Sequence, residues 1–484
     1  CRICWGGDHP DGGALESPCS CRGTSQYAHL ECILDAFRAR AQWLDICCPT
    51  CMKPYSGQVG VAVAQVALQA LMEMEDNFDA LPIAAASVNL AQACSSTCDL
   101  QAALVHLQDA LAIQEQALGP DHLEVARTLS LFGAALHGAG ADSGTAVLER
   151  ALAIQERALG PEHPELGLTL HLLGSVKVAS LEMEAGVGLL ERALAITEPS
   201  LGPQHLEVVR IVGCLGQAYA SSGNPEVGRD FLQRALGVIE QEIGPQHVET
   251  ALLLTDLGSA HVALGDAEQG RSVLERALEI MQNALGPQHL QVAHTVECLA
   301  EALAVLGDAE GRTALLQQVV DIRGRELGPR HPEVALAVAR LGKEHAEQGD
   351  PTLGRELLAR ALAVLKTELG PQHVSVGLVL GYLCRAHFLL GDPARSRSLG
   401  LRSLEILESE LGPHHVEVGF SLGRLGRAEL ALGNVACGTD FLERALAVKE
   451  FNFGPEDPEV AHACRCLGEG LVSSGDARRG RALL

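Results

Sequence analysis

Eight cysteine and histidine side chains at the start of the chain have the types and spacing of zinc ligands. They are Cys1, Cys4, Cys19, Cys21, His29, Cys32, Cys48 and Cys51. A structural zinc site closes a tetrahedron of four thiolate or imidazole ligands, and close ligand pairs are its usual signature. Eight ligands are enough for two such sites. Cys47 competes for the seventh position, but Cys48 leaves the two-residue gap before Cys51 that zinc knuckles use.

The rest of the chain is a repeat that predicts pairs of helices. A glycine recurs at intervals of 41 or 42 residues, at Gly119, Gly160, Gly202, Gly244, Gly286, Gly328, Gly370, Gly412 and Gly454. Between these glycines, apolar residues recur three and four apart, which puts them on one helix face. Small residues such as Gly174 and Gly342 stand where the two helices of a unit should approach closely. One such hairpin cannot bury its apolar face alone, so neighbouring units must stack.

We therefore predict a mostly α fold with three parts. Residues 1–57 form a small two-zinc module, and residues 58–80 form a connecting helical segment. Residues 81–484 form an α-solenoid of about nine to ten helix-turn-helix repeats, each of 42 residues, with the last repeat cut short.

Histidines recur three residues after these glycines, which raises the question of a metal array. They are His122, His163, His205, His247, His289, His331, His373 and His415, and Asp457 takes the ninth position. Equivalent residues in stacked units lie at least about 8–10 Å apart, whereas a Zn–N bond is about 2.0–2.1 Å long. An imidazole or carboxylate near a helix start suits the capping of free backbone N–H groups. We expect helix caps.

Charge and composition restrict the partners. The chain has 61 acidic and 36 basic residues, a net charge of −25, which argues against nucleic acid because phosphate-backbone binding needs an excess of cations. No apolar run reaches the roughly 18 residues of a membrane span. Zinc thiolates need a reducing compartment, so the expected location is the cytoplasm or nucleus. The sequence motifs of common covalent and phosphate-binding enzymes are missing.

One register of the repeat carries three successive cations. Lys343, Arg385 and Arg427 each follow a repeat glycine by fifteen residues, a position expected to face the groove of the solenoid. Three such cations could hold an acidic peptide segment or a C-terminal carboxylate. A solvated helix face is the alternative.

The zinc-ligand segment resembles the RING-CH (RING-variant) family of ubiquitin ligases over residues 1–55. The motifs that carry the resemblance are Cys1-Arg-Ile-Cys4, Pro18-Cys-Ser-Cys-Arg-Gly23, His29-Leu-Glu-Cys32 and Cys47-Cys-Pro-Thr-Cys51. The cross-braced topology of the family implies one zinc on Cys1, Cys4, His29 and Cys32, and a second on Cys19, Cys21, Cys48 and Cys51. A plant-homeodomain finger has the same ligand order, but the Cys19-x-Cys21-x7-His29 spacing favours the ligase family.

This resemblance implies docking of a ubiquitin-conjugating enzyme, with catalysis by positioning and no covalent step on the protein. By motif position, the docking surface maps onto Ile3 and Pro49, completed by an aromatic ring, Trp43 or Phe37. Many active RING domains carry Arg or Lys directly after the last ligand, where this chain has Met52. That difference bears on how strongly the module would activate the enzyme.

The repeats resemble the tetratricopeptide repeats of kinesin light chains over residues 81–484, which implies a right-handed superhelix with a concave groove for peptides. The asparagines with which that family holds a peptide are replaced, for example by Ala339 and Arg340, so its cargo recognition does not carry over. The sequence thus indicates a ubiquitin ligase that recruits a conjugating enzyme and selects protein substrates. The alternatives are a non-catalytic zinc-binding adaptor and, less favoured, a histone reader.

Overall fold

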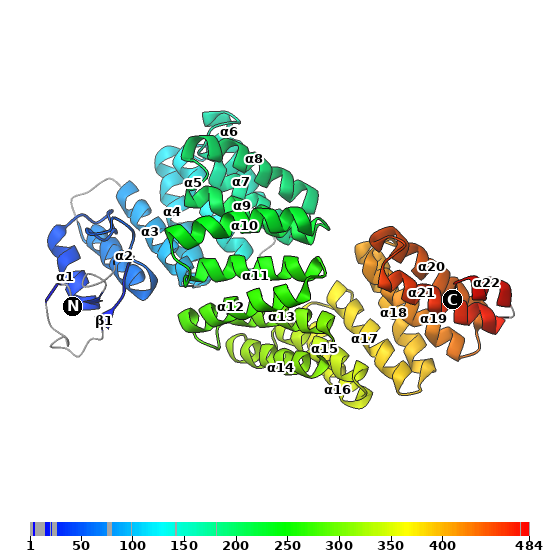
Figure 1. The fold of residues 1–484 in the computed structure, drawn as a ribbon. Helices are drawn as coiled ribbons and strands as arrows, with labels where there is room; N and C mark the ends of the chain where they lie inside the picture. Colours follow the sequence, from blue (N-terminus) through cyan, green and yellow to red (C-terminus); the bar gives the residue numbers. More distant parts are fainter. Residues whose placement is uncertain are drawn as a thin grey trace. The chain divides into compact units, whose positions relative to one another are not determined.

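The chain forms two compact units, Cys1–Ile239 and Glu240–Leu484. The computed structural model describes residues 3–4, 15–19, 21, 27–74, 80–97, 99–140, 143–180, 182–474 and 476–483. These residues form two short strands and 22 helices (Figure 1). The strands are β1 (Leu15–Glu16) and β2 (Ala28–His29), paired antiparallel with Leu15 opposite His29.

The helices follow one another along the chain, and from Leu81 onward their connections are short. They are α1 (Leu30–Arg40), α2 (Gly57–Met72), α3 (Leu81–Ser96), α4 (Leu100–Leu118), α5 (Leu123–Gly138), α6 (Gly144–Leu159), α7 (Leu166–Ala179), α8 (Met183–Leu201), α9 (Leu206–Ser221), α10 (Pro225–Glu242), α11 (Val248–Ala263), α12 (Ala267–Leu285), α13 (Leu290–Leu306), α14 (Ala309–Glu326), α15 (Pro332–Glu347), α16 (Pro351–Glu368), α17 (Val374–Leu389), α18 (Pro393–Leu411), α19 (Val416–Ala431), α20 (Val435–Phe453), α21 (Pro458–Ser474) and α22 (Ala477–Leu483). In chain order, α3 to α22 make ten helix pairs, which confirms the predicted helical repeat array.

Glycines let the two helices of a repeat approach closely, as α7 and α8 show. A Cβ atom added to Gly174 would lie 2.8 Å from Cγ of Leu190, and one added to Gly186 would lie 3.0 Å from the carbonyl oxygen of Gly174. Any side chain at these positions would force the helices apart. The small residues predicted at the helix contacts therefore set the spacing within the repeat.

Another set of glycines ends the second helix of a repeat. Gly119, which follows α4, has φ 89° and ψ 157°, and Gly160, which follows α6, has φ 90° and ψ 159°. Residues with a Cβ atom are strained in this region, so glycine is needed where the chain leaves one repeat for the next.

The repeated histidines cap helices, as predicted. Nδ1 of His331 accepts a hydrogen bond of 3.2 Å from the backbone N–H of Glu333, at the start of α15. The same cap, at 3.1 to 3.3 Å, is made by His122, His205, His247, His289, His373 and His415. His163 accepts the equivalent bond at 3.2 Å from Glu165, the residue just before α7. The carboxylate of Asp457 accepts the equivalent bond from Glu459 at 2.7 Å. An unpaired backbone donor at each helix start explains the repeat of this residue.

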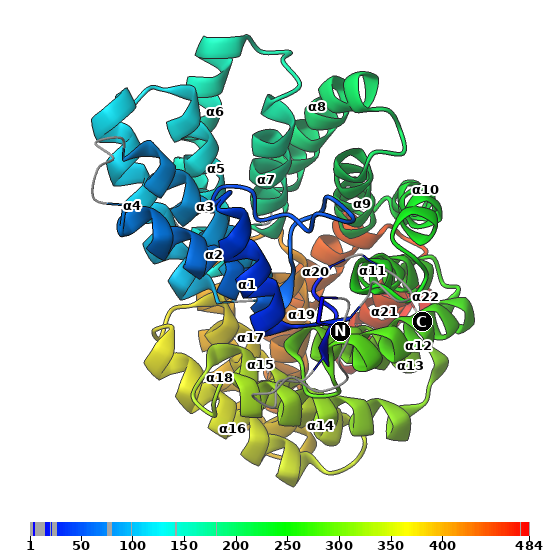
Figure 2. The same ribbon diagram turned by 90° about the vertical axis from the view of Figure 1, so that its left-hand side faces the viewer.

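Helix α2 belongs to two cores at once. Its residues Val59, Val63 and Ala67 complete a cluster with residues of β2 and α1, namely Ala28, Ile33, Leu34 and Phe37. Ala64 of α2 joins a second cluster with residues of α3 and α4, including Leu90, Ala91 and Leu107. Figure 2 shows α1 beside α2, and α2 beside α3. The amino-terminal module is thus attached to the first repeat through side-chain packing.

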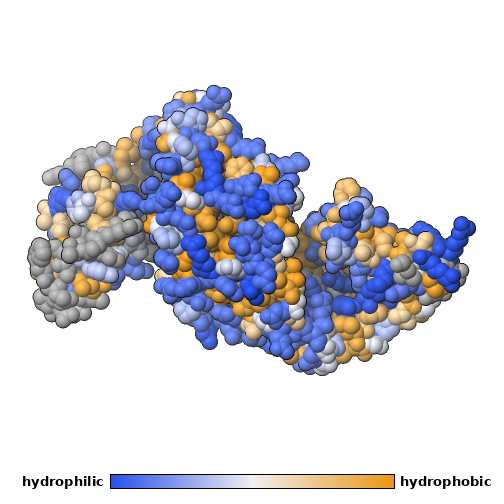
Figure 3. Space-filling model, in the orientation of Figure 1, coloured by the Kyte–Doolittle hydropathy of each residue, from blue (hydrophilic) through white to orange (hydrophobic). Residues whose placement is uncertain are grey.

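Because the helices are amphipathic, polar and apolar residues form alternating strips on the surface of the repeats. Figure 3 shows these strips on one face. Among the described residues, no helix combines the length and the apolar character that a membrane crossing requires.

The histidine caps generate a prediction about local stability. Replacing His331 by Ala removes the acceptor at the start of α15 and should cost about 1 kcal/mol, so the first-turn amides should exchange roughly fivefold faster. His331→Asp should keep the slow exchange, because Asp457 makes the same bond in its own repeat. Hydrogen exchange followed by mass spectrometry would measure both variants. Equal rates for the Ala and Asp variants would contradict a capping role.

Candidate metal centre

Four cysteine thiols meet in the loops that flank the two strands and α1. The Sγ atoms of Cys19, Cys21, Cys48 and Cys51 all lie within 4.8 Å of one another. Cys21 and Cys48 are buried, and their Sγ atoms are 3.8 Å apart. A tetrahedron with Zn–S bonds of about 2.3 Å has sulfur atoms about 3.8 Å apart. The cluster therefore has the donor set and the size of a zinc site.

A second cluster joins Cys4, His29 and Cys32. Nδ1 of His29 lies 3.4 Å from Sγ of Cys4 and 3.7 Å from Sγ of Cys32. Bonds of about 2.0–2.1 Å to nitrogen and about 2.3 Å to sulfur place these atoms about 3.6 Å apart around tetrahedral zinc. His29 is held at the end of β2 and Cys32 in the first turn of α1. This cluster also fits zinc, and Cys1, its expected fourth ligand, lies outside the described residues.

The two clusters alternate along the chain. Cys4 precedes the pair Cys19 and Cys21, the pair His29 and Cys32 follows, and Cys48 and Cys51 come last. The described ligands thus group in the interleaved way that the RING-variant resemblance implies. Each cluster joins described ligands from before β2 to ligands from β2 or after it, so both clusters bring together segments far apart in the sequence.

The environment of the thiols differs between the clusters. Burial raises the pKa of Cys48, but hydrogen bonds from the backbone N–H groups of Cys51 and Thr50 and from the thiols of Cys19 and Cys51 together lower this pKa to about 6. The Thr50 N–H lies 3.4 Å from Sγ of Cys48. Burial, together with the nearby Cys4 thiol, raises the pKa of Cys32. Crowded thiols cannot all ionise without a cation between them, so these groups are suited to a metal ion.

Cys47 has a different role from its neighbour. Its backbone N–H donates to Oδ1 of Asp45 at 3.1 Å, and it pairs through a β-bridge with Pro54. Burial and the Asp45 carboxylate raise the pKa of its thiol. Cys47 is not among the four clustered thiols.

The residues expected to dock a conjugating enzyme are exposed to different degrees. Ile3 is 39% exposed, Pro49 is exposed and Trp43 is half-buried. Phe37 is only 2% exposed and meets the Trp43 ring edge-on at 5.6 Å, in the core that α1 shares with α2. The suggestion that Phe37 reaches a partner is therefore wrong, because its ring is used to fill this core.

In the second unit, the three cations of one register line a single cavity. Lys343, Arg385 and Arg427 share a cavity of about 350 Å³ with two further cations, Arg424 and Lys449. We call this cavity the basic pocket. Lys449 forms an ion pair of 2.6 Å with Glu459, whereas the other four form no ion pair within the described residues.

Aromatic rings support the cations of the basic pocket. The guanidinium of Arg427 lies 4.9 Å from the ring centre of Phe388, and that of Arg424 lies 5.2 Å from Tyr382. Burial and the charge of Arg427 lower the pKa of Arg385. Neighbouring positive charges thus oppose one another here, and an anion would relieve that repulsion.

Sequence reasoning missed two members of the basic pocket. Arg424 lies three residues before Arg427, one turn away on α19, and Lys449 lies on α20. The register fifteen residues after the repeat glycine contains only three of the cations, whereas the cavity contains cations from three registers. Comparing charges over all registers that face the groove would have found both residues.

Comparison with known protein families agrees with this architecture. Residues 1–51 match the RING-variant domain. Residues 82–147 and 207–269 match one model of the tetratricopeptide repeat, and residues 250–291 and 292–333 match another. The chain therefore carries a RING-variant domain followed by tetratricopeptide repeats, and such repeats are protein-interaction modules. No curated protein matches the chain significantly.

Several solved structures resemble parts of the repeat array. TPR-like repeats of a protein described as a kinesin light chain, from Podosopora anserina, are 21% identical over 43% of this chain and 98% of theirs, with a TM-score of 0.38. BtubC from P. vanneervenii is 18% identical over 45% and 88%, with a TM-score of 0.38. The apo form of RapI is 10% identical over 59% and 97%, with a TM-score of 0.47. At these values they carry no argument about function.

The neighbouring cysteines 47 and 48 allow a matched test of the metal centre. Cys48→Ser removes a clustered thiol, so we expect lower zinc content by atomic emission and faster hydrogen exchange in α1, because metal binding and folding are coupled. Cys47→Ser should keep the zinc content of the unaltered chain. If the Cys47 variant loses zinc and the Cys48 variant does not, the assignment of the cluster is overturned.

Proposed function

We propose that this chain is a RING-type ubiquitin-protein ligase that binds two zinc ions, docks a ubiquitin-conjugating enzyme and selects protein substrates through its repeats. The observation that carries the proposal is the pair of interleaved clusters at zinc-ligand distances within a segment that matches the RING-variant domain. When bound, zinc would replace the apolar core that so small a module cannot build.

Docking, in this proposal, uses Ile3, Pro49 and Trp43. The exposed Ile3 and Pro49 adjoin cluster ligands, Cys4 and Cys48, so the metal sites would hold both at fixed positions. Such a surface does no covalent chemistry, and its contribution would be to restrain the ubiquitin thioester in a reactive geometry. Met52, 71% exposed, leaves the position after the last ligand without a positive charge, which favours modest activation.

Helix α2 supports a coupling between docking and substrate selection. Because α2 packs on α1 with one face and on α3 with another, the docking side and the first repeats belong to one compact unit. A substrate bound by these repeats would therefore be held within the same unit as the bound conjugating enzyme. Thiolate ligands also favour a reducing location, the cytoplasm or nucleus.

The basic pocket is proposed as a site for acidic peptide segments. Four cations that form no ion pair with a described residue line this cavity of about 350 Å³, together with the carboxylates of Glu347 and Glu459. These cations would provide charge-assisted hydrogen bonds to the carboxylates of a peptide. The rings of Tyr382 and Phe388 hold the cations in place, which lowers the entropy lost on binding.

The alternative function is a non-catalytic zinc-binding adaptor, because zinc clusters and repeats would equally serve a scaffold. Ubiquitin chain formation with a conjugating enzyme distinguishes the ligase from the adaptor.

The ligase proposal predicts zinc-dependent ubiquitin chains in a reconstituted reaction with the full chain. Ile3→Ala should slow chain formation roughly thirtyfold, because truncating a central docking residue costs about 2 kcal/mol, while zinc content stays the same. Leu15→Ala, which truncates another exposed aliphatic residue of the module, is the matched control and should remain active. Absence of chains from the unaltered protein with two bound zinc ions, across a panel of conjugating enzymes, would favour the adaptor.

The basic pocket predicts salt-sensitive binding of a glutamate-rich probe peptide. Reversing Lys343, Arg385 and Arg427 to Glu together should abolish binding measured by fluorescence anisotropy, because repulsion replaces attraction. Reversing three exposed cations of the same unit outside the pocket, Arg330, Arg360 and Arg402, provides the control with equal net charge. Equal loss in both variants would reject a specific site and leave only general attraction.

A further inference from the structure

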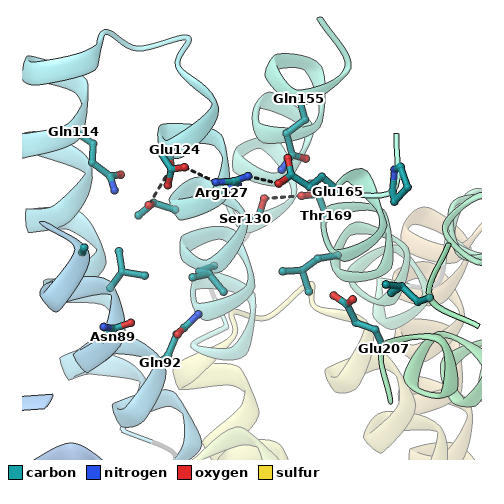
Figure 4. A pocket seen from close by; sticks show the side chains of 17 residues that line it. Asn89, Gln92, Gln114, Glu124, Arg127, Ser130, Gln155, Glu165, Thr169 and Glu207 are labelled. Atoms are coloured by element: carbon teal, nitrogen blue, oxygen red, sulfur yellow. Dashed lines mark hydrogen bonds and ion pairs between the residues drawn. The ribbon is translucent and has the colours of Figure 1, made fainter. Parts of the chain in front are cut away.

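A separate cavity in the first unit is lined by amide side chains. It has a volume of about 540 Å³, within the about 300–1,000 Å³ of ligand sites, and lies among helices α3 to α9 (Figure 4). We call it the amide cavity. Asn89 and Gln92 reach it from α3, Gln114 from α4 and Gln155 from α6.

Two of these amides are buried without a partner. Gln114 is 6% exposed and Gln155 is 2% exposed, and neither Oε1 atom has a hydrogen-bond partner among the described residues. The two residues are 41 positions apart and occupy equivalent places in successive repeats. A buried amide oxygen left without a donor costs about 1–3 kcal/mol. A ligand that offers donors at both places would remove this cost.

Within the part of the chain that the structure describes, Gln114 and Gln155 hold the only buried side-chain amide atoms without a hydrogen-bond partner. Thr197 takes the equivalent place in the next repeat, and its hydroxyl donates to the carbonyl of Ala193 at 2.8 Å. The hydroxyls of Ser130 and Thr169, which also line the cavity, bond to each other at 2.7 Å. The hydroxyls there are therefore satisfied, and the two glutamines remain to bind a ligand.

A peptide main chain in an extended form matches these amides. It presents N–H donors and C=O acceptors alternately, so it can satisfy the buried glutamines and also bond to Asn89 and Gln92. This match holds for either orientation of each amide group, since the main chain supplies both partners.

The charges at the cavity exclude an acidic ligand. Arg127 is bonded on one side to Glu124 and on the other to Glu165, so its charge is already neutralised (Figure 4). Glu207, from α9, lines the cavity and forms no ion pair with a described residue. A basic side chain of the ligand would complement this carboxylate.

A smaller apolar pocket adjoins the amide cavity. Its volume is about 250 Å³, and it shares Gln92 and Leu131 with the larger cavity. Leu100, Leu107 and Ala135 give it an apolar lining. An aliphatic side chain of a bound peptide would enter here beside the amides.

We propose that the amide cavity binds an extended peptide segment whose main chain bonds to Gln114 and Gln155, with an aliphatic side chain in the adjoining pocket and a basic side chain at Glu207. The substrate-selecting role of this site rests on the proposed ligase function, whereas peptide binding itself does not. The amide cavity would thus take ligands opposite in charge to those of the basic pocket.

The experiment begins with a phage-displayed library of random short peptides selected on the full chain. Synthetic versions of the enriched peptides are then titrated by calorimetry. We expect an aliphatic and a basic residue in the enriched sequences. The double variant Gln114→Leu, Gln155→Leu should weaken binding roughly tenfold or more, because two hydrogen bonds are lost. Glu207→Gln should weaken it in proportion to the charge on the peptide.

Controls separate this result from misfolding and from loss of ligase activity. Leu in place of a buried unpaired Gln should keep or raise the thermal stability, and Gln233→Leu, on the exposed face of α10, should bind as the unaltered chain does. Methylation of main-chain nitrogens of the peptide should abolish binding. Ubiquitin chain formation without substrate should not change in the double variant. No enriched peptide, or enriched peptides that bind the double variant equally well, would overturn the proposal.

Discussion

A cysteine-rich module of about 57 residues buries little apolar surface by itself, and the packing of α2 against it explains how the first unit is built. Ile33 and Phe37 of α1 have too few apolar partners within the module, so Val59 and Val63 of α2 complete their core. The opposite side of α2 packs on α3. Because one helix contributes to two cores, the cysteine and histidine clusters and the first repeats are parts of a single packed structure.

The repeat scaffold separates stability from recognition. Gly174 and the turn glycines keep the helix pairs close, and histidines such as His331 satisfy the helix starts. These positions recur with little change along the array. Residues that line the cavities change from one repeat to the next. Similar helix pairs therefore carry the amides of Gln114 and Gln155 in one unit and the cations of the basic pocket in the other.

Burial decides what each polar position can do. Each of the eight repeated histidines accepts a hydrogen bond from a backbone N–H group, as His331 does, although an imidazole can also bind a metal. His29, in contrast, lies between the thiols of Cys4 and Cys32. A histidine in a helix start is far from its equivalents in other repeats. The same side chain therefore caps a helix in the array and fits a metal site in the module, and local geometry alone separates these roles.

The sequence by itself determined the α-helical repeats, the helix caps and the zinc-ligand candidates, because each depends on residues close together in the chain. Ligand pairs such as Cys48 and Cys51 are readable from spacing, and so is the alternation of helix and turn. The burial of Phe37 was not readable, since an aromatic on an amphipathic helix can face a core or a partner. Only the tertiary structure brought Arg424 and Lys449 to the basic pocket and, among the described residues, left the Oε1 atoms of Gln114 and Gln155 without a hydrogen-bond partner. Such cavities form where helices from several repeats pack together. The position of a residue within its repeat does not show which residues of other repeats lie close to it in space.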